Sequence, residues 1–243
     1  MPKIYLRVSK YVGSFMRADG NGNSISKQTP IQLSQCSDEY AVMVHSLRIV
    51  PETQQRRACC YSQSAWNNML RGRLPEGGKP IIQRDPKDYL TYAEVCTLER
   101  LPNKTRREAY EFLCIALPRE IYVDGRIELV SSSHTLDTSA ANQLRRIFRQ
   151  RFIREYLYFE ARQRDWCREQ RIDRTDVEIL ERFFMKWDIP VSHDNKEREH
   201  LRRQIFRWRK EGKRMANEAD VIGDAEITRV DEYELRGGLP KYE

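Results

Sequence analysis

The feature that most constrains the fold of this chain is the helical periodicity between Asp137 and Met215. Apolar residues recur there at spacings of three and four, the pattern of helices that rest one side on a core. The first helix is predicted to begin at Asp137, Thr138 or Ser139, each of which offers a side-chain oxygen that can cap the first turn, and to continue to Trp166. Its predicted core stripe consists of Leu144, Phe148, Phe152, Tyr156 and Phe159.

Two further amphipathic helices are predicted to follow. The second ends at Ile189-Pro190, because proline cannot continue a helix. Its predicted core residues are Val177, Leu180, Phe183, Phe184 and Trp187. The third is predicted to start near Asp194 or Asn195 and to end near Met215. In this helix an apolar arc lies opposite a basic arc. The apolar arc is Leu201, Ile205 and Trp208, and the basic arc is Arg203, Arg207, Lys210 and Arg214.

The basic arc is the part of the sequence that most suggests a function. Arginine and lysine side chains on one helix face can contact the phosphates or base edges of a nucleic acid. The alternative is an ordinary solvated face, partly balanced by Glu197, Glu199 and Glu211. The connection from Asp188 to Asp194 is also longer than the three or four residues of a helix-turn-helix module.

Charge is distributed unevenly along the chain, whose formal net charge is +7. Residues 143–215 hold 21 Lys and Arg against 13 Asp and Glu, whereas residues 216–243 hold 3 against 8. Together with the serine run at Ser131–Ser133, this predicts three parts. They are an α+β N-terminal domain (1–135), a basic helical domain (136–215) and an extended acidic tail (216–243).

The N-terminal part is predicted to contain a small antiparallel sheet. Ile4, Leu6 and Val8 alternate with polar residues, which predicts a half-buried strand. Further strands are expected at residues 31–33, 40–50 and 112–117, and Asp124-Gly125 predicts a hairpin between residues 121–123 and 126–129. The fold class is therefore α+β.

Helices are predicted at residues 52–70, before the break at 76–80, and from the capping box Thr91–Glu94 through Leu101. Trp66 lies at the end of the first of these, beside polar and basic residues. Such a group can be a stacking platform for single-stranded nucleic acid. A tryptophan in this setting is more often part of a core, and we favour that interpretation.

No motif in the sequence predicts catalysis, a cofactor or a metal. The six cysteines include no C-x-x-C pair and are predicted to be buried reduced thiols. Phosphate-loop, dinucleotide and nucleophile-elbow motifs are absent. His200, Arg203 and Tyr233 loosely resemble the end of a tyrosine-recombinase catalytic domain. That resemblance would imply phosphate-binding and nucleophilic roles, but the arginine box and Gly-His motif of that family are absent.

Two functional hypotheses follow. The first is a non-enzymatic nucleic-acid-binding protein that contacts DNA or RNA phosphates through the basic arc, with the acidic tail folding back on it. The second is a structural or assembly subunit of a complex or particle. Its basic helices and its acidic tail would make the subunit contacts, with acidic protein surfaces or with other copies of the chain in a homo-oligomer. No apolar run is long enough to span a membrane and no secretory signal begins the chain, so an intracellular, cytoplasmic protein is expected.

Overall fold

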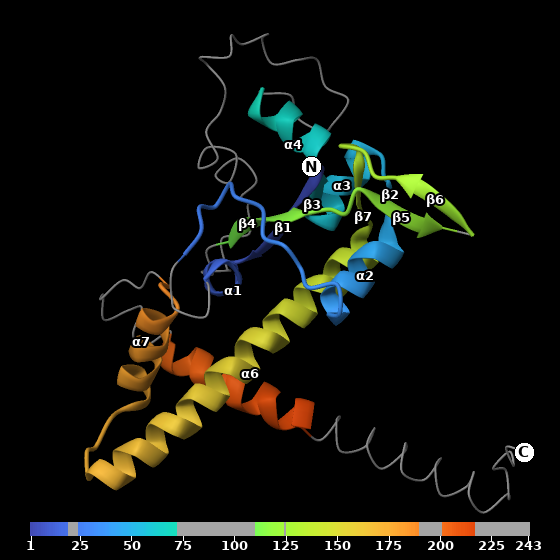
Figure 1. The fold of residues 1–243 in the computed structure, drawn as a ribbon. Coiled ribbons are helices and arrows are strands. Elements are labelled where there is room, and N and C mark those ends of the chain that lie inside the picture. The colour runs from blue at the N-terminus through green and yellow to red at the C-terminus, as the bar shows by residue number, and fades with distance from the viewer. Residues whose placement is uncertain (19–23, 72–109, 124, 190–200, 217–243) are drawn as a thin grey trace, which may run out of the picture. The chain divides into compact units, whose positions relative to one another are not determined.

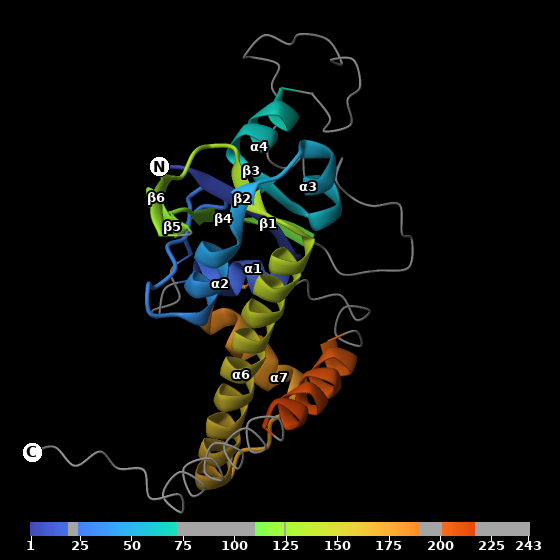
Figure 2. The same ribbon diagram turned by 90° about the vertical axis from the view of Figure 1, so that its right-hand side faces the viewer.

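The computed structural model describes residues 1–18, 24–71, 110–123, 125–189 and 201–216. It has a mixed α+β fold with helices and small antiparallel sheets (Figures 1 and 2). Two compact units are present: Met1–Phe152 with Phe184–Val191, and Ile153–Phe183 with Ser192–Glu243. Each unit is described separately below. The predicted boundary near residue 135 stays a prediction.

The first unit contains a three-stranded antiparallel sheet with the order β3-β1-β4. Strand β1 (Lys3–Ser9) pairs on one side with β3 (Cys60–Ser62) and on the other with β4 (Tyr110–Ala116). The predicted strands at the N-terminus and at residues 112–117 are therefore confirmed. The predicted alternation is confirmed at Ile4, Leu6 and Val8, which are buried, but Tyr5 is buried as well, with its ring stacked 4.3 Å from that of Trp66.

A buried ion pair lies beside this sheet. Helix α1 (Lys10–Arg17) follows β1 directly, and Arg17 Nη1 lies 2.7 Å from Glu111 Oε1 of β4. Both side chains are buried, and the exposed Lys27 approaches the second carboxylate oxygen at 3.3 Å. Gly13 of α1 permits this arrangement, since a Cβ at that position would lie 1.8 Å from Glu111 Oε1.

The prediction of a long strand over residues 40–50 is wrong. The chain forms helix α2 (Asp38–Ser46) and then a short strand, β2 (Leu47–Ile49). The Ser37 hydroxyl caps the helix by accepting a hydrogen bond from the Tyr40 N–H at 3.2 Å, and Asp38 and Glu39 lie in the first turn. The apolar, β-branched composition of this stretch concealed its N-terminal helix signal.

The single helix predicted over residues 52–70 is interrupted. Helix α3 (Glu52–Ala58) ends at Cys59, which has a left-handed φ of 51°, and β3 follows before α4 (Gln63–Leu70). The Gln55 side chain supports the break by bonding the Val50 carbonyl and the Ser62 N–H. The predicted buried side is largely confirmed, because Ala58, Tyr61, Ala65, Trp66 and Met69 are buried. Burial of Trp66 rules out a stacking platform there.

The predicted hairpin is confirmed. Strands β5 (Glu120–Val123) and β6 (Arg126–Leu129) pair antiparallel, with Gly125 at a positive φ of 79°. Strand β7 (His134–Leu136) then pairs antiparallel with β2. The predicted strand at residues 31–33 is reduced to one bridge between Ile31 and Ile115.

Helices α6 (Thr138–Gln170) and α7 (Asp176–Lys186) confirm the first two predicted amphipathic helices. Helix α6 has 33 residues and is capped by Asp137, whose carboxylate accepts a hydrogen bond from the Ala140 N–H at 2.8 Å. Every predicted core residue of these two helices is buried except Phe159 and Trp187, which are half-buried. In the first unit Phe15 makes edge-on ring contacts with Phe152 and Trp187.

Several predictions fall on residues outside the described ranges. They are the break at 76–80, the helix from Thr91 to Leu101, the start of the third helix at Asp194 or Asn195, and the acidic tail apart from Ala216. His200 and Tyr233 lie outside these ranges too. Among the helices within them, none is both long enough and apolar enough to cross a membrane.

Candidate nucleic-acid interface

The candidate interface is the helix formed by residues 201–216 in the second unit. Its predicted apolar arc is confirmed, because Leu201, Ile205 and Trp208 are all buried. The Trp208 ring meets the Tyr156 ring of α6 edge-on, with 5.4 Å between the ring centroids. Gly212 allows a close approach to α6, since a Cβ there would lie 2.2 Å from Leu157 Cδ1. These contacts direct the other side of the helix towards solvent.

The four residues of the predicted basic arc are all exposed: Arg203, Arg207, Lys210 and Arg214. Helical geometry places them on one face, and the two ends of the set lie about 16 Å apart along the axis. In the part of the chain that the structure describes, the side chains of Arg207 and Lys210 form no hydrogen bond or ion pair. The charge of these two groups is therefore available to a ligand.

The sequence analysis did not identify the full width of this cationic face or the exposed aromatic residue near its centre. Residues 201–216 contain seven Arg and Lys and one acidic residue, Glu211. At 100° per residue, the seven cationic positions cover an arc of about 160°, with Phe206 close to its centre. Phe206 is 70% exposed. The signal was present in the sequence, because Phe206 falls outside the apolar arc of its helix.

Arg209 has a different role from the other cations of this helix. Its guanidinium joins a partly buried ionic cluster with Glu160 and Arg164 of α6 and Asp176 of α7. Glu160 is the centre of the cluster, with a side chain that is only 5% exposed. Arg209 Nε donates to its two oxygens at 3.1 and 3.2 Å, and Nη2 makes a shorter contact with one of them. The cluster fixes the basic helix against α6 and α7.

The second carboxylate of the cluster, that of Asp176, also accepts hydrogen bonds from both arginines. Arg209 Nη1 donates to Asp176 Oδ2 at 2.9 Å, and Arg164 bonds both Asp176 and Glu160. The hydrogen bond from Arg209 holds the pKa of Asp176 below its usual value. The hydrogen bond that Arg209 donates to Glu160 raises the pKa of Arg209. Each of the two carboxylates is thus held by two guanidinium groups.

Tyr156 lies at the apolar edge of the cluster. Its ring meets that of Phe183 edge-on at 5.4 Å, and its buried hydroxyl has no hydrogen-bond partner among the described residues. Burial raises its pKa. The arrangement supports a structural role that orients the basic helix.

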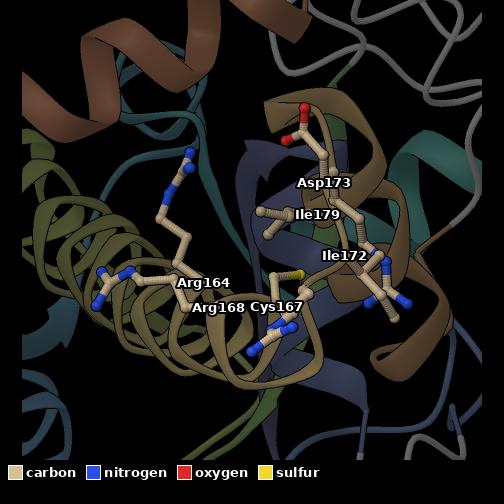
Figure 3. Close-up of a pocket in the computed structure, with 8 residues that line it drawn as sticks. Arg164, Cys167, Arg168, Ile172, Asp173 and Ile179 are labelled. Carbon is tan, nitrogen blue, oxygen red and sulfur yellow. The ribbon is translucent and has the colours of Figure 1, made fainter.

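A second basic feature lies at the turn from α6 to α7. A cavity of about 390 Å³ is lined by four arginines, Arg164, Arg168, Arg171 and Arg174, with Cys167 and Ile179 (Figure 3). Most of this charge is already compensated. Arg164 belongs to the ionic cluster, Arg168 lies 3.0 Å from Asp165, and Asp173 also lines the cavity. The cavity is therefore a weaker anion site than the exposed basic face.

The backbone at this turn is strained at Arg171. The N–H groups of Arg171 and Ile172 bond the carbonyls of Arg168 and Cys167, which closes helix α6 with a Schellman motif. Arg171 occupies the left-handed position of the motif, with a φ of 55°, where glycine is usual.

Five cysteines are in the described ranges and all are free, but only Cys60, Cys114 and Cys167 are buried. The prediction of buried thiols is wrong for Cys36, which is exposed, and only partly right for Cys59.

His134 belongs to β7, where it is buried. Its Nδ1 lies 2.9 Å from the Ser131 hydroxyl and accepts a hydrogen bond from the Ser131 N–H at 3.0 Å. Its Nε2 lies 3.2 Å from Glu128 Oε1. These contacts bind the imidazole to the turn between β6 and β7.

Comparison of the chain with models of protein families, with curated proteins and with solved structures found no match.

Proposed function

We propose that this protein binds nucleic acid, without catalysing a reaction on it, through the exposed basic face of the helix of residues 201–216. The observation that carries the proposal is the contrast between the two sides of this helix. One side is fixed by buried apolar residues and by Arg209 in the ionic cluster. The other side presents Arg203, Arg207, Lys210 and Arg214 to solvent.

The magnitude of the charge supports this proposal over an ordinary solvated face. A typical solvated helix mixes both signs of charge, and its pairs at i and i+4 neutralise each other. Residues 201–216 have seven cationic groups and one carboxylate, whereas residues 153–183 of the same unit have seven cationic and eight acidic groups. The positive charge is thus concentrated on one helix, and this concentration favours contact with a row of phosphates.

The proposal is tested by charge reversal with a matched control. The test variant is Arg207→Glu with Lys210→Glu, and the control is Arg119→Glu with Arg126→Glu, which changes net charge equally at exposed positions elsewhere. Fluorescence anisotropy of labelled duplex DNA, single-stranded DNA and RNA at low salt measures affinity. We expect the test variant to lose at least tenfold in affinity and the control to lose little. Equal losses in both variants would refute a defined interface.

A second candidate function, a structural subunit of an assembly, is favoured by the β5–β6 hairpin. Tyr122 and Ile127 are cross-strand partners, so they lie on the same face of the hairpin as Leu129. These three side chains are 70%, 66% and 75% exposed. Ile121 on the opposite face is buried. An exposed apolar face on a two-stranded hairpin is typical of a protein interface or of an edge that pairs with another chain.

Light scattering across a range of protein concentrations tests this second function. An assembly subunit should associate as concentration rises, and Ile127→Lys should abolish the association without unfolding the chain, because the side chain is exposed. A monomer at every concentration would contradict self-assembly through the hairpin.

A further inference from the structure

Phe206 is an apolar side chain on the exposed face of its helix, where its neighbours are cationic. The ring is 70% exposed, although its neighbours at i−1 and i+2, Ile205 and Trp208, are buried. Arg202 and Arg203 lie one turn before it, and Lys210 lies one turn after it. Exposure of a large aromatic ring to water is unfavourable by roughly 25 cal/mol for each Å² of apolar surface.

We propose that Phe206 is a base-stacking residue and that the preferred ligand of the basic face is single-stranded nucleic acid. The inference rests on the proposed function and specifies its ligand class. Cationic groups on both sides of the ring meet successive phosphates, and the ring meets the face of the base between them. This is the combination of a positive surface and an aromatic platform that single-strand-binding proteins use.

The choice of single strands over duplex follows from which surface of a base is available. In a duplex the base faces are stacked on their neighbours, and a groove presents only base edges and the thymine methyl group. An unpaired base exposes its whole face, which matches the flat ring of phenylalanine. The same unpaired bases occur in single-stranded DNA and in RNA loops, so the stacking chemistry is shared by both.

The neighbouring helices make less convincing single-strand surfaces. Helix α6 exposes Tyr158 and Trp166, and the guanidinium groups of Arg162 and Arg174 lie 5.7 and 4.6 Å from the centres of these two rings. Residues 153–183, however, have one more acidic than basic residue, so phosphates gain no net attraction there. Only Phe206 combines exposure with a strongly cationic setting in the part of this unit that the structure describes.

The experiment compares Phe206→Ala with Phe206→Trp and Phe206→Leu in the full chain, using labelled oligo(dT), oligo(U) and a DNA duplex. Phe206→Ala is expected to weaken binding to both single strands about tenfold and to leave duplex binding unchanged. Phe206→Trp restores the affinity, because it restores a π-face. Phe206→Leu does not, because it supplies only apolar bulk. Met185→Ala, at another exposed apolar position, is the control and should change nothing.

The salt dependence separates stacking from phosphate contact. Phe206→Ala should lower affinity equally at every salt concentration, because it removes no ion contact, whereas Arg207→Ala should reduce the salt slope by about one phosphate contact. If Phe206→Ala binds single strands as tightly as the wild type, or if Phe206→Leu restores affinity fully, the stacking proposal is overturned while phosphate binding stands. If the wild type binds none of the three nucleic acids at low salt, both proposals fail.

Discussion

Replacement of Glu160 by glutamine should destabilise the second unit by about 3 kcal/mol. Glu160 is 5% exposed and accepts charge-assisted hydrogen bonds from both Arg164 and Arg209. Each such interaction contributes about 1.5–3 kcal/mol when buried. The two arginine side chains are 38% and 35% exposed, so they recover part of this energy by hydration once the carboxylate is gone. We therefore take about 1.5 kcal/mol for each of the two interactions, which gives a loss of about 3 kcal/mol in the free energy of unfolding.

The assay is urea unfolding followed by tryptophan fluorescence and circular dichroism, with the free energy of unfolding compared between variants. Glu169→Gln is the matched control, because Glu169 is exposed on the same helix and should change the stability by less than 0.5 kcal/mol. A double-mutant cycle with Arg209→Met should give a coupling energy of roughly 1–2 kcal/mol. A loss in Glu160→Gln no larger than that in Glu169→Gln would refute the view that the cluster fixes the basic helix.

Three further predictions concern stability. The pKa of Asp176 is lowered in the folded state by its hydrogen bond to Arg209, so its contribution is full at neutral pH and is lost as pH falls below its usual value of 3.8. The stability difference between wild type and Asp176→Asn in urea unfolding should therefore shrink below that pH. Arg171→Gly relieves a left-handed backbone and should raise stability by about 0.5–1 kcal/mol, measured by urea unfolding. Gly13→Ala places a Cβ 1.8 Å from the buried Glu111 carboxylate and should cost about 3 kcal/mol in thermal unfolding.

The helical part of the fold could be predicted well because its periodicity is strong over long segments. The stripe through Leu144, Phe148 and Phe152 was confirmed, and the helix is capped by Asp137, one of the three candidates. The errors lie in short elements, where local signals compete. Residues 40–50 have β-branched character, but the cap at Ser37 and the acidic first turn produce α2.

In the candidate site, too, features set by local sequence could be predicted, and features set by residues distant in the sequence could not. The exposed positions of the basic arc follow from spacing within one helix, so they could be predicted. Arg209 could not, because its partners Glu160 and Asp176 lie 49 and 33 residues away in the sequence and meet it only in the fold. The break at Cys59 has a similar cause, since the strand β3 that follows it forms by pairing with β1, which is distant in the sequence.

The salt dependence of binding to labelled single-stranded DNA tests the central claim most directly. Four phosphate contacts through Arg203, Arg207, Lys210 and Arg214 predict a slope of log affinity against log salt of about −2.8 on single strands. The double variant Arg207→Ala with Lys210→Ala should reduce the magnitude of this slope to about 1.4. A flat salt dependence in the wild type, or a slope that the double variant does not change, would contradict the assignment of this helix as the nucleic-acid interface.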